Sequence, residues 1–132
     1  MFCRERAARF AALRGELAAS GVTLAFVGNG NVMMANAFKE DFDVQDPLYT
    51  DTSRASYKAL GLKRNFGLMK SLGRGKRAMA AGFKQGKTAG DVWQQGGVVL
   101  FDADGSVRWK HIDDGAGDPA DLSAFRAAVA AL

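Results

Sequence analysis

The chain has 132 residues, of which 48% are hydrophobic and 24% are charged, and its formal net charge is +4. This length suits one domain with its own core, so we expect a single domain over residues 1–132. Its apolar runs fall short of the ~20 residues of a membrane span, and one cysteine with one histidine excludes a disulfide framework and a cysteine-rich zinc site. We therefore expect a reduced, cytoplasmic protein with no membrane contact, metal or cofactor.

Residues 3–19 are predicted to form the first helix. Three apolar side chains recur there at helical spacing, with alanines between them: Phe10, Leu13 and Leu17. The arginine-rich start resembles a transit peptide, but such peptides are poor in acidic residues, and Glu5 and Glu16 interrupt the run. We therefore expect a folded helix that ends before Gly21.

The next elements alternate between strand and helix. Residues 22–27 are predicted to form a buried strand between two glycines, and residues 32–42 a second helix. Residues 47–50 form a short extended piece. Residues 51–53 offer N-caps for a short helix that Gly61 ends. A strand followed by a helix and an extended piece favours parallel strand pairing.

Residues 63–92 form a basic, glycine-rich insertion. They carry eight lysines or arginines against Asp91 alone, together with six glycines. We interpret them as a solvated loop; an electropositive surface for an anionic ligand is the alternative. Nucleic-acid binding ranks last, because only Phe66 and Phe83 supply aromatic rings. A near-match to a phosphate-binding loop at residues 81–88 lacks the first glycine and the preceding strand.

The C-terminal part predicts an antiparallel hairpin and a final helix. Residues 98–101 and 107–112 form the strands around an Asp-Gly turn. Asp118 is predicted as the N-cap of the last helix, with Pro119 and Asp121 in its first turn and an apolar stripe at Leu122, Phe125, Val129 and Leu132. On the hairpin, His111 shares a face with Val107 and Trp109, so a packed or a surface histidine is expected rather than a general base. The fold class is α/β with a mixed sheet flanked by helices.

Several stretches resemble the peroxiredoxin-like branch of the alkyl hydroperoxide reductase/thiol-specific antioxidant family, which has a thioredoxin fold. They are residues 2–5 (FCRE), 24–30 (LAFVGNG), Asp51 with Arg54, Tyr57 and residues 59–62 (ALGL), 93–97 (WQQGG), 107–111 (VRWKH) and 117–119 (GDP). The resemblance implies a thioredoxin-like mixed sheet and reduction of hydroperoxides by a cysteine at a helix N-terminus.

Two departures from the family pattern concern the start of the chain. Members of this branch carry Cys-x-x-Cys at the first helix, and Cys3 matches only its second cysteine. Members also have a central strand ahead of that motif, and this sequence has none. The flanking strands would then leave unpaired backbone edges, unless they close together or a partner chain, such as a second copy in a homodimer, donates a strand. In addition, Gln95 and Gly96 stand where thioredoxins place a cis-proline.

Cys3 has a catalytic and a structural interpretation. A helix N-terminus and the neighbouring Arg4 and Arg6 favour a thiolate, which attacks peroxide or disulfide sulfur. Cys3 also lies about 20° from Phe10 on the helical wheel, where a free cysteine behaves as a small hydrophobe. A cysteine matching the second of the pair is, in the family, normally the resolving member.

The predicted site therefore combines Cys3 as the catalytic residue with four supporting residues: Arg4, Trp93, Gln94 and Gln95. By the resemblance, residues 93–95 lie near the first helix, so Gln94 or Gln95 would donate a hydrogen bond to a substrate oxygen. The expected partners are a small-molecule peroxide and a thiol or disulfide. The alternative is a non-catalytic or truncated thioredoxin-like scaffold that acts by binding.

Overall fold

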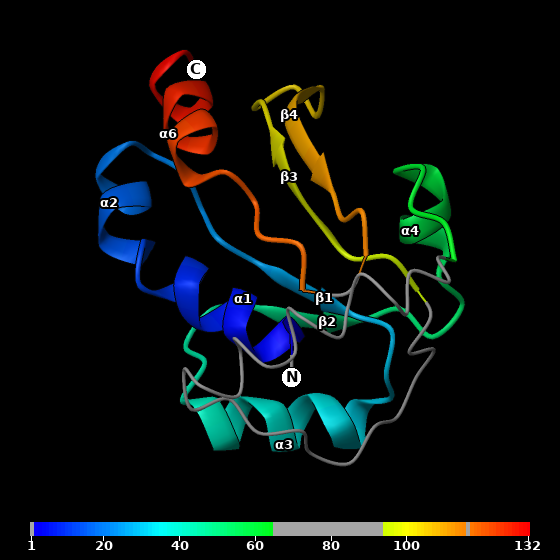
Figure 1. The fold of residues 1–132 in the computed structure, drawn as a ribbon. Helices are drawn as coiled ribbons and strands as arrows, with labels where there is room; N and C mark the ends of the chain where they lie inside the picture. The colour runs from blue at the N-terminus through cyan, green and yellow to red at the C-terminus, as the bar shows by residue number, and fades with distance from the viewer. Residues whose placement is uncertain (1, 65–93, 116) are drawn as a thin grey trace.

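The computed structural model describes residues 2–64, 94–115 and 117–132, and Figure 1 shows their arrangement. Residues 65–92 of the predicted basic insertion, the near-match to a phosphate-binding loop and Trp93 lie outside the described residues. In the part that is described, no helix is long and apolar enough to cross a membrane.

The first predicted helix is two helices, α1 (Phe2–Ala11) and α2 (Arg14–Ala19). The prediction of one uninterrupted helix over residues 3–19 was therefore wrong. At the break the Leu13 amide donates to the carbonyl of Phe10 at 2.9 Å, three residues back, which tightens the turn. Gly15 lowers helix propensity just beyond it. Phe10, Leu13 and Leu17 still reach one core.

Strand β1 (Phe26–Gly28) pairs in parallel with β2 (Leu48–Thr50), as the strand–helix order predicted. The strand expected over residues 22–27 is thus shorter and begins later. Only three residues find ladder partners, because β2 is itself short and follows Pro47. Helix α3 (Val32–Phe42) connects the two strands with the predicted bounds, and the Asn31 side chain accepts a hydrogen bond from the Met34 amide at its start.

The short helix α4 (Ala55–Ala59) follows β2. The Asp51 carboxylate accepts hydrogen bonds from the Ser53 hydroxyl and from the amide and hydroxyl of Ser56, which hold the pKa of Asp51 well below its usual range. Asp51 therefore stabilises the start of α4, although Arg54 occupies the N-cap position, with a φ of 61°. Gly61, at a φ of 77°, ends the turn as predicted.

Strands β3 (Gly97–Phe101) and β4 (Val107–Ile112) form the predicted antiparallel hairpin. A register shift between Leu100 and Phe101 marks a bulge, and Gly105 supplies the positive φ that the turn needs. The Trp109 and His111 rings lie on one face, stacked with centroids 6.5 Å apart.

Helix α6 (Leu122–Ala130) begins later than predicted. Asp121 is its N-cap and accepts from the amides of Ser123 and Ala124, so the assignment of that role to Asp118 was wrong. The Asp118 carboxylate instead accepts from the Asp114 amide at 2.9 Å. Of the predicted stripe, Phe125 is buried, whereas Leu132 lies past the helix end and is exposed.

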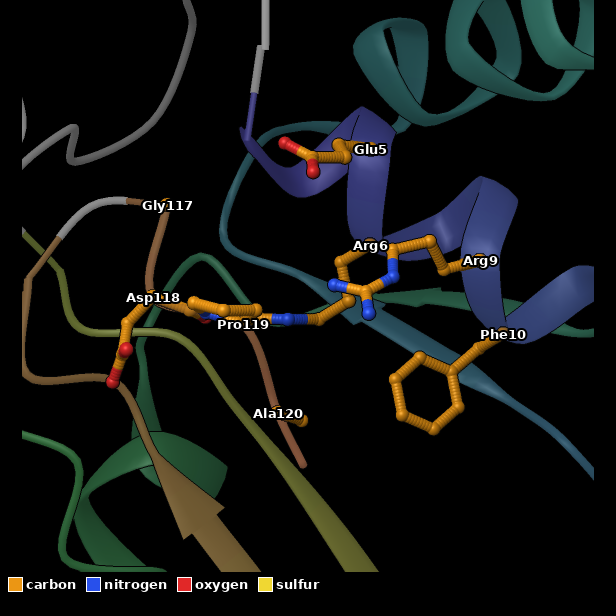
Figure 2. A pocket seen from close by; sticks show the side chains of 8 residues that line it. All are labelled: Glu5, Arg6, Arg9, Phe10, Gly117, Asp118, Pro119 and Ala120. Atoms are coloured by element: carbon orange, nitrogen blue, oxygen red, sulfur yellow. The ribbon is translucent and has the colours of Figure 1, made fainter. Parts of the chain in front are cut away.

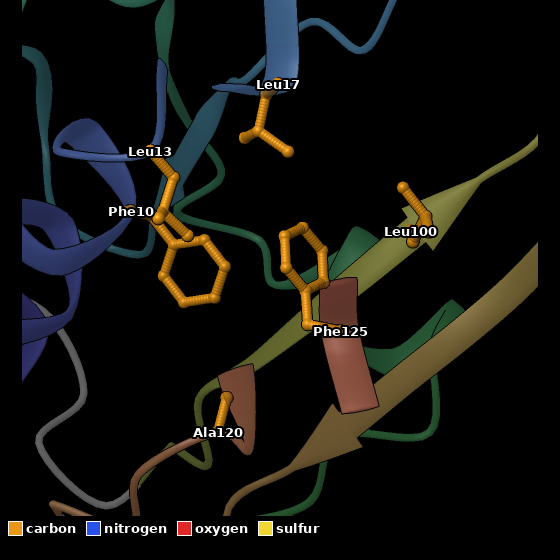
Figure 3. Packing of buried hydrophobic residues seen from close by; sticks show 6 residues of the cluster. All are labelled: Phe10, Leu13, Leu17, Leu100, Ala120 and Phe125. Carbon is orange, nitrogen blue, oxygen red and sulfur yellow. The ribbon is translucent and has the colours of Figure 1, made fainter. Parts of the chain in front are cut away.

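The hydrophobic core joins α1 and α2 to the hairpin and α6 (Figure 3). Its buried members are Phe10, Leu13, Leu17, Leu100, Ala120 and Phe125. The Phe125 ring packs edge-on against Phe10 at 5.2 Å and against Trp109 at 5.5 Å. Aromatic pairs at such distances add to the hydrophobic gain from burial.

The four described strands form two separate two-stranded sheets, β1–β2 and β3–β4. Among the described residues, no backbone hydrogen bond joins one pair to the other. Val99 lies between Val98 and Leu100 on β3. Because the hydrogen bonds of an antiparallel pair fall on every second residue, the backbone amide and carbonyl of Val99 point away from β4. The parallel pair and the hairpin predicted from the sequence are both present. In the described residues, neither pair is hydrogen-bonded to the other.

Candidate active site

Cys3 is the second residue of α1, in its first turn. In general, the positive end of the helix dipole at such a position favours a thiolate over a thiol. Arg4, Glu5 and Arg6 occupy the next three positions on the same helix. The structure describes side chains from Arg4 onward. The surroundings of the first turn are therefore described by the residues that follow Cys3.

The Arg4 guanidinium stacks on the last residue of α3. Its central carbon lies 4.9 Å from the centre of the Phe42 ring. Such a cation–π contact contributes on the order of 1 kcal/mol. Arg4 thus joins the first turn of α1 to the end of α3 through Phe42.

Gln94 and Gln95 bind other parts of their own chain. The side-chain nitrogen of Gln95 donates to the backbone carbonyl of Asp113 at 2.9 Å, and its side-chain oxygen accepts from the backbone amide of Lys63 at 2.8 Å. The side-chain nitrogen of Gln94 lies 3.3 Å from the backbone carbonyls of Leu62 and Lys63. These bonds fix the segment ahead of β3; the predicted donation to a substrate oxygen stays a prediction.

Arg6 links α1 to the residues that follow β4. One of its terminal nitrogens lies 2.5 Å from an Asp113 carboxylate oxygen and 3.1 Å from the carbonyl of Asp118. Figure 2 shows the Arg6 side chain extending from α1 toward Asp118 and Pro119. Arg6, Asp118 and Pro119 help to line a hollow of about 20 Å³, which has room for one water molecule.

Asp113 is buried at the end of β4, with 7% of its side chain exposed. Burial raises the pKa of this carboxyl above its usual value, and Arg6 offsets part of that effect by charge and by hydrogen bonding. The Asp113 amide donates to the carbonyl of Gly96 at 3.0 Å. Asp113 therefore receives hydrogen bonds from Arg6 through its carboxylate and from Gln95 through its carbonyl.

Gly96 leaves the space in which Arg6 and Asp113 meet. A Cβ atom at this position would lie 2.6 Å from an Arg6 nitrogen and 2.7 Å from an Asp113 oxygen. Both distances are shorter than side chains tolerate without movement. The backbone at residue 96 is thus packed directly on the ion pair.

His111 lies beside the same carboxylates. Its Nε2 atom is 3.5 Å from Asp113 and 3.4 Å from Asp118, yet this buried nitrogen has no hydrogen-bond partner among the residues that the structure describes. Of the two environments expected for His111, packed or at the surface, its 21% side-chain exposure agrees with the packed one. Together with Arg6, these residues form a polar cluster, Arg6–His111–Asp113–Asp118, behind the first turns of α1.

A larger hollow of about 400 Å³ lies at the other end of the helical layer, between α2 and the segment before β2. Its charged residues, Arg14 and Asp46, form a bidentate ion pair, in which two guanidinium nitrogens donate to the two carboxylate oxygens at 2.9 and 2.6 Å. That pairing leaves the hollow no free charge of its own to bind a ligand, so the chemistry of the described residues concentrates near α1.

The sequence did not reveal the polar cluster, although it contains its members. In the sequence analysis Arg6 was considered only as a neighbour of Cys3, and Asp118 only as a helix cap. Residues 6 and 113 are 107 positions apart, and no local pattern links them. In the described residues no group of three ligating side chains forms a metal site.

Two comparisons bear on identity. A family model described as "AhpC/TSA antioxidant enzyme" matches residues 9–115, a range that begins after Cys3 and Arg4. The thioredoxin-like protein AAED1, chloroplastic, of Arabidopsis thaliana is 31% identical over 111 residues. That alignment covers 76% of this chain and 45% of the relative, so the chain spans less than half the length of this relative.

The family match explains the arrangement of the elements. A parallel β1–β2 pair, an antiparallel hairpin and flanking helices are consistent with a thioredoxin-like fold. The resemblance found in the sequence is thereby confirmed over most of the chain. The chain belongs to the AhpC/TSA antioxidant enzyme family.

Proposed function

We propose that this protein is a peroxiredoxin-like thiol oxidoreductase that reduces hydroperoxides through Cys3. The observation that carries the proposal is the place of Cys3 in the first turn of α1, in a chain of the AhpC/TSA family. A helix N-terminus favours the thiolate, which is the form that attacks peroxides. The sequence holds one cysteine, so Cys3 is the one thiol that this chain offers.

The proposed cycle uses one cysteine and an external thiol. The Cys3 thiolate attacks one peroxide oxygen; an S–O bond forms, the O–O bond breaks, and water or an alcohol leaves after taking a proton. A first external thiol attacks the resulting sulfenic acid, forming a mixed disulfide and water. A second external thiol then releases Cys3 as a thiol, together with an external disulfide. The cycle suits a compartment that supplies reduced thiols, such as the cytoplasm.

The second candidate is a thioredoxin-like scaffold without turnover. Two observations favour it: the family match begins at residue 9, after Cys3, and the amide groups of Gln94 and Gln95 bind carbonyls and an amide of their own chain. Within the described residues, β1–β2 and β3–β4 each have edges that no further strand pairs, which also supports the expected homodimer, in which a second copy would supply a pairing strand. The molar mass from light scattering tests that part: a monomer at all concentrations contradicts it.

Turnover tests the proposed function. The purified chain, given hydrogen peroxide or an organic hydroperoxide and excess dithiothreitol, is expected to consume peroxide faster than the buffer does. Cys3→Ser is the control, because it changes one atom and removes the nucleophile. Peroxide consumption that is the same for wild type, Cys3→Ser and buffer rejects the enzyme and leaves the scaffold.

A further inference from the structure

The Arg6 side chain ties three separate segments together at one point. It leaves α1 one turn after Cys3 and meets Asp113 at the end of β4 and the carbonyl of Asp118 in the segment before α6. Asp113 in turn holds Gln95 and Gly96 ahead of β3. A single guanidinium therefore fixes the start of α1 relative to the segment that carries the predicted supporting glutamines.

The geometry at Gly96 shows how tight this junction is. An added methyl group would meet both partners of the ion pair at less than 3.0 Å. The Arg6 side chain is only 19% exposed and that of Asp113 7%, so water does not screen the pair as it screens surface pairs. The Arg6 guanidinium places one terminal nitrogen on both acceptors and the other against Gly96, an arrangement that the single ammonium nitrogen of a lysine does not reproduce.

The first turn of an α-helix frays more readily than its middle, because its amides lack intrahelical partners, unless caps or tertiary contacts hold it. Its amides and its dipole activate a thiol only while the turn is formed. Arg6 lies three residues beyond Cys3, on the next turn of α1. An anchor at that position holds the turn in which Cys3 lies.

We propose that Arg6 is a positioning residue for Cys3, which keeps the first turn of α1 formed and packed against the Gln95–Gly96 segment through Asp113. The inference rests on the proposed function for its effect on the thiol. The anchoring itself does not depend on that function, so it has a measurement of its own.

The test compares Arg6→Lys with Arg9→Lys, using the full chain. Arg9 lies on the same helix, and the same change there keeps the charge without breaking the Asp113 contact. We expect Arg6→Lys to speed amide hydrogen exchange in residues 4–8 by about tenfold. We also expect it to slow iodoacetamide labelling of Cys3 by about tenfold at neutral pH and to move the labelling profile to higher pH. Arg9→Lys should leave all three unchanged.

A second variant protects the test against a general loss of folding. Asp113→Asn removes the partner charge at nearly the same shape, and the double variant Arg6→Lys/Asp113→Asn should be no slower in labelling than the slower single variant. Additive losses in the double variant, or equal effects of Arg6→Lys and Arg9→Lys, overturn the proposal.

The failure of the inference and that of the proposed function give different results. If wild-type Cys3 fails to react with peroxide but Arg6→Lys still speeds exchange in residues 4–8, the anchor stands and the enzyme does not. If Cys3 reacts with peroxide and Arg6→Lys changes neither exchange nor labelling, the enzyme stands and the anchor is rejected.

Discussion

The two strand pairs of this protein differ in what they pack against. In the β3–β4 hairpin, Leu100 is buried and Trp109 lies edge-on to Phe125 of α6. In the β1–β2 pair, Val27 and Tyr49 face each other across the strands but remain 49% and 60% exposed. α3, which connects these strands, has no buried residue.

The difference shows where the stability of the fold comes from. The hairpin shares its core with α1, α2 and α6, whereas β1 contributes mainly Phe26 to the edge of that core. A two-stranded sheet of three-residue strands is marginal by itself in water. The β1–β2 pair therefore depends on its attachments to the packed region, while the hairpin and its helices do not depend on β1–β2 to the same degree.

The largest expected effect tests this difference directly. Phe125→Ala removes a ring that is 3% exposed, and we expect it to lower the free energy of unfolding by about 3–5 kcal/mol. Tyr49→Ala, at the exposed face of β2, should change it by no more than about 0.5 kcal/mol. Urea unfolding followed by tryptophan fluorescence measures both. Equal losses would show that the two regions carry the core alike.

A glycine pair sharpens the comparison within the packed region. Gly96→Ala forces a methyl group against Arg6 and Asp113, so we expect a loss of about 1–3 kcal/mol from overpacking. Gly15→Ala in α2 meets no atom within 4 Å and should stabilise the helix by about 0.5–1 kcal/mol. Thermal unfolding ranks the two variants against wild type, and a neutral Gly96→Ala would contradict the close packing at that point.

The pair Arg14–Asp46 joins the two regions, since Arg14 belongs to α2 and Asp46 precedes β2. Arg14 lowers the pKa of Asp46 through its hydrogen bonds and its charge. Because the folded-state pKa is below the unfolded value of about 3.9, this stabilisation is present above that pH and disappears as the pH falls through the folded-state pKa.

We therefore expect Asp46→Asn to cost about 1–2 kcal/mol at pH 7, since Arg14 is partly exposed and a charged hydrogen bond is lost. The difference between variant and wild type should shrink toward zero near pH 2. Chemical unfolding at the two pH values measures it. A difference that grows on acidification would contradict the assigned direction of the pKa change.

The smallest expected effect concerns the start of α6. Asp121→Ala removes two hydrogen bonds to helix amides and should cost about 1 kcal/mol. Asp121→Asn keeps an oxygen acceptor, so its cost should be only a few tenths of that amount. Thermal denaturation of the two variants separates capping from charge, and a harmless Asp121→Ala would return the cap to another residue.

Local signals predicted α3 and the hairpin well. Asn31 caps α3, the Phe38 and Phe42 rings pack at 5.1 Å, one helical turn apart, and an Asp-Gly turn fixes the hairpin. Asp118 and Asp121 were harder to tell apart, because both suit an N-cap. The choice was made by a contact outside the helix, the hydrogen bond from the Asp114 amide to Asp118.

The candidate site was predictable only in part. The sequence located Cys3 at a helix start, because composition and spacing are local properties. It could not pair Arg6 with Asp113 or show that Gly96 packs on both, since these contacts depend on how distant segments meet. The break after α1 and the short β1 also depend on contacts with distant segments. Leu13 turns into the core at the break, and β2 offers β1 only three partners.

The most direct measurement is the mass of the intact protein after exposure to about one equivalent of hydrogen peroxide in the presence of dimedone. Dimedone captures a sulfenic acid before it reacts further. We expect one adduct, located at Cys3 by peptide mapping and absent from Cys3→Ser. A wild-type chain that stays unmodified while a small thiol added to the same solution is oxidised would contradict the assignment of Cys3 as a peroxide-reducing residue.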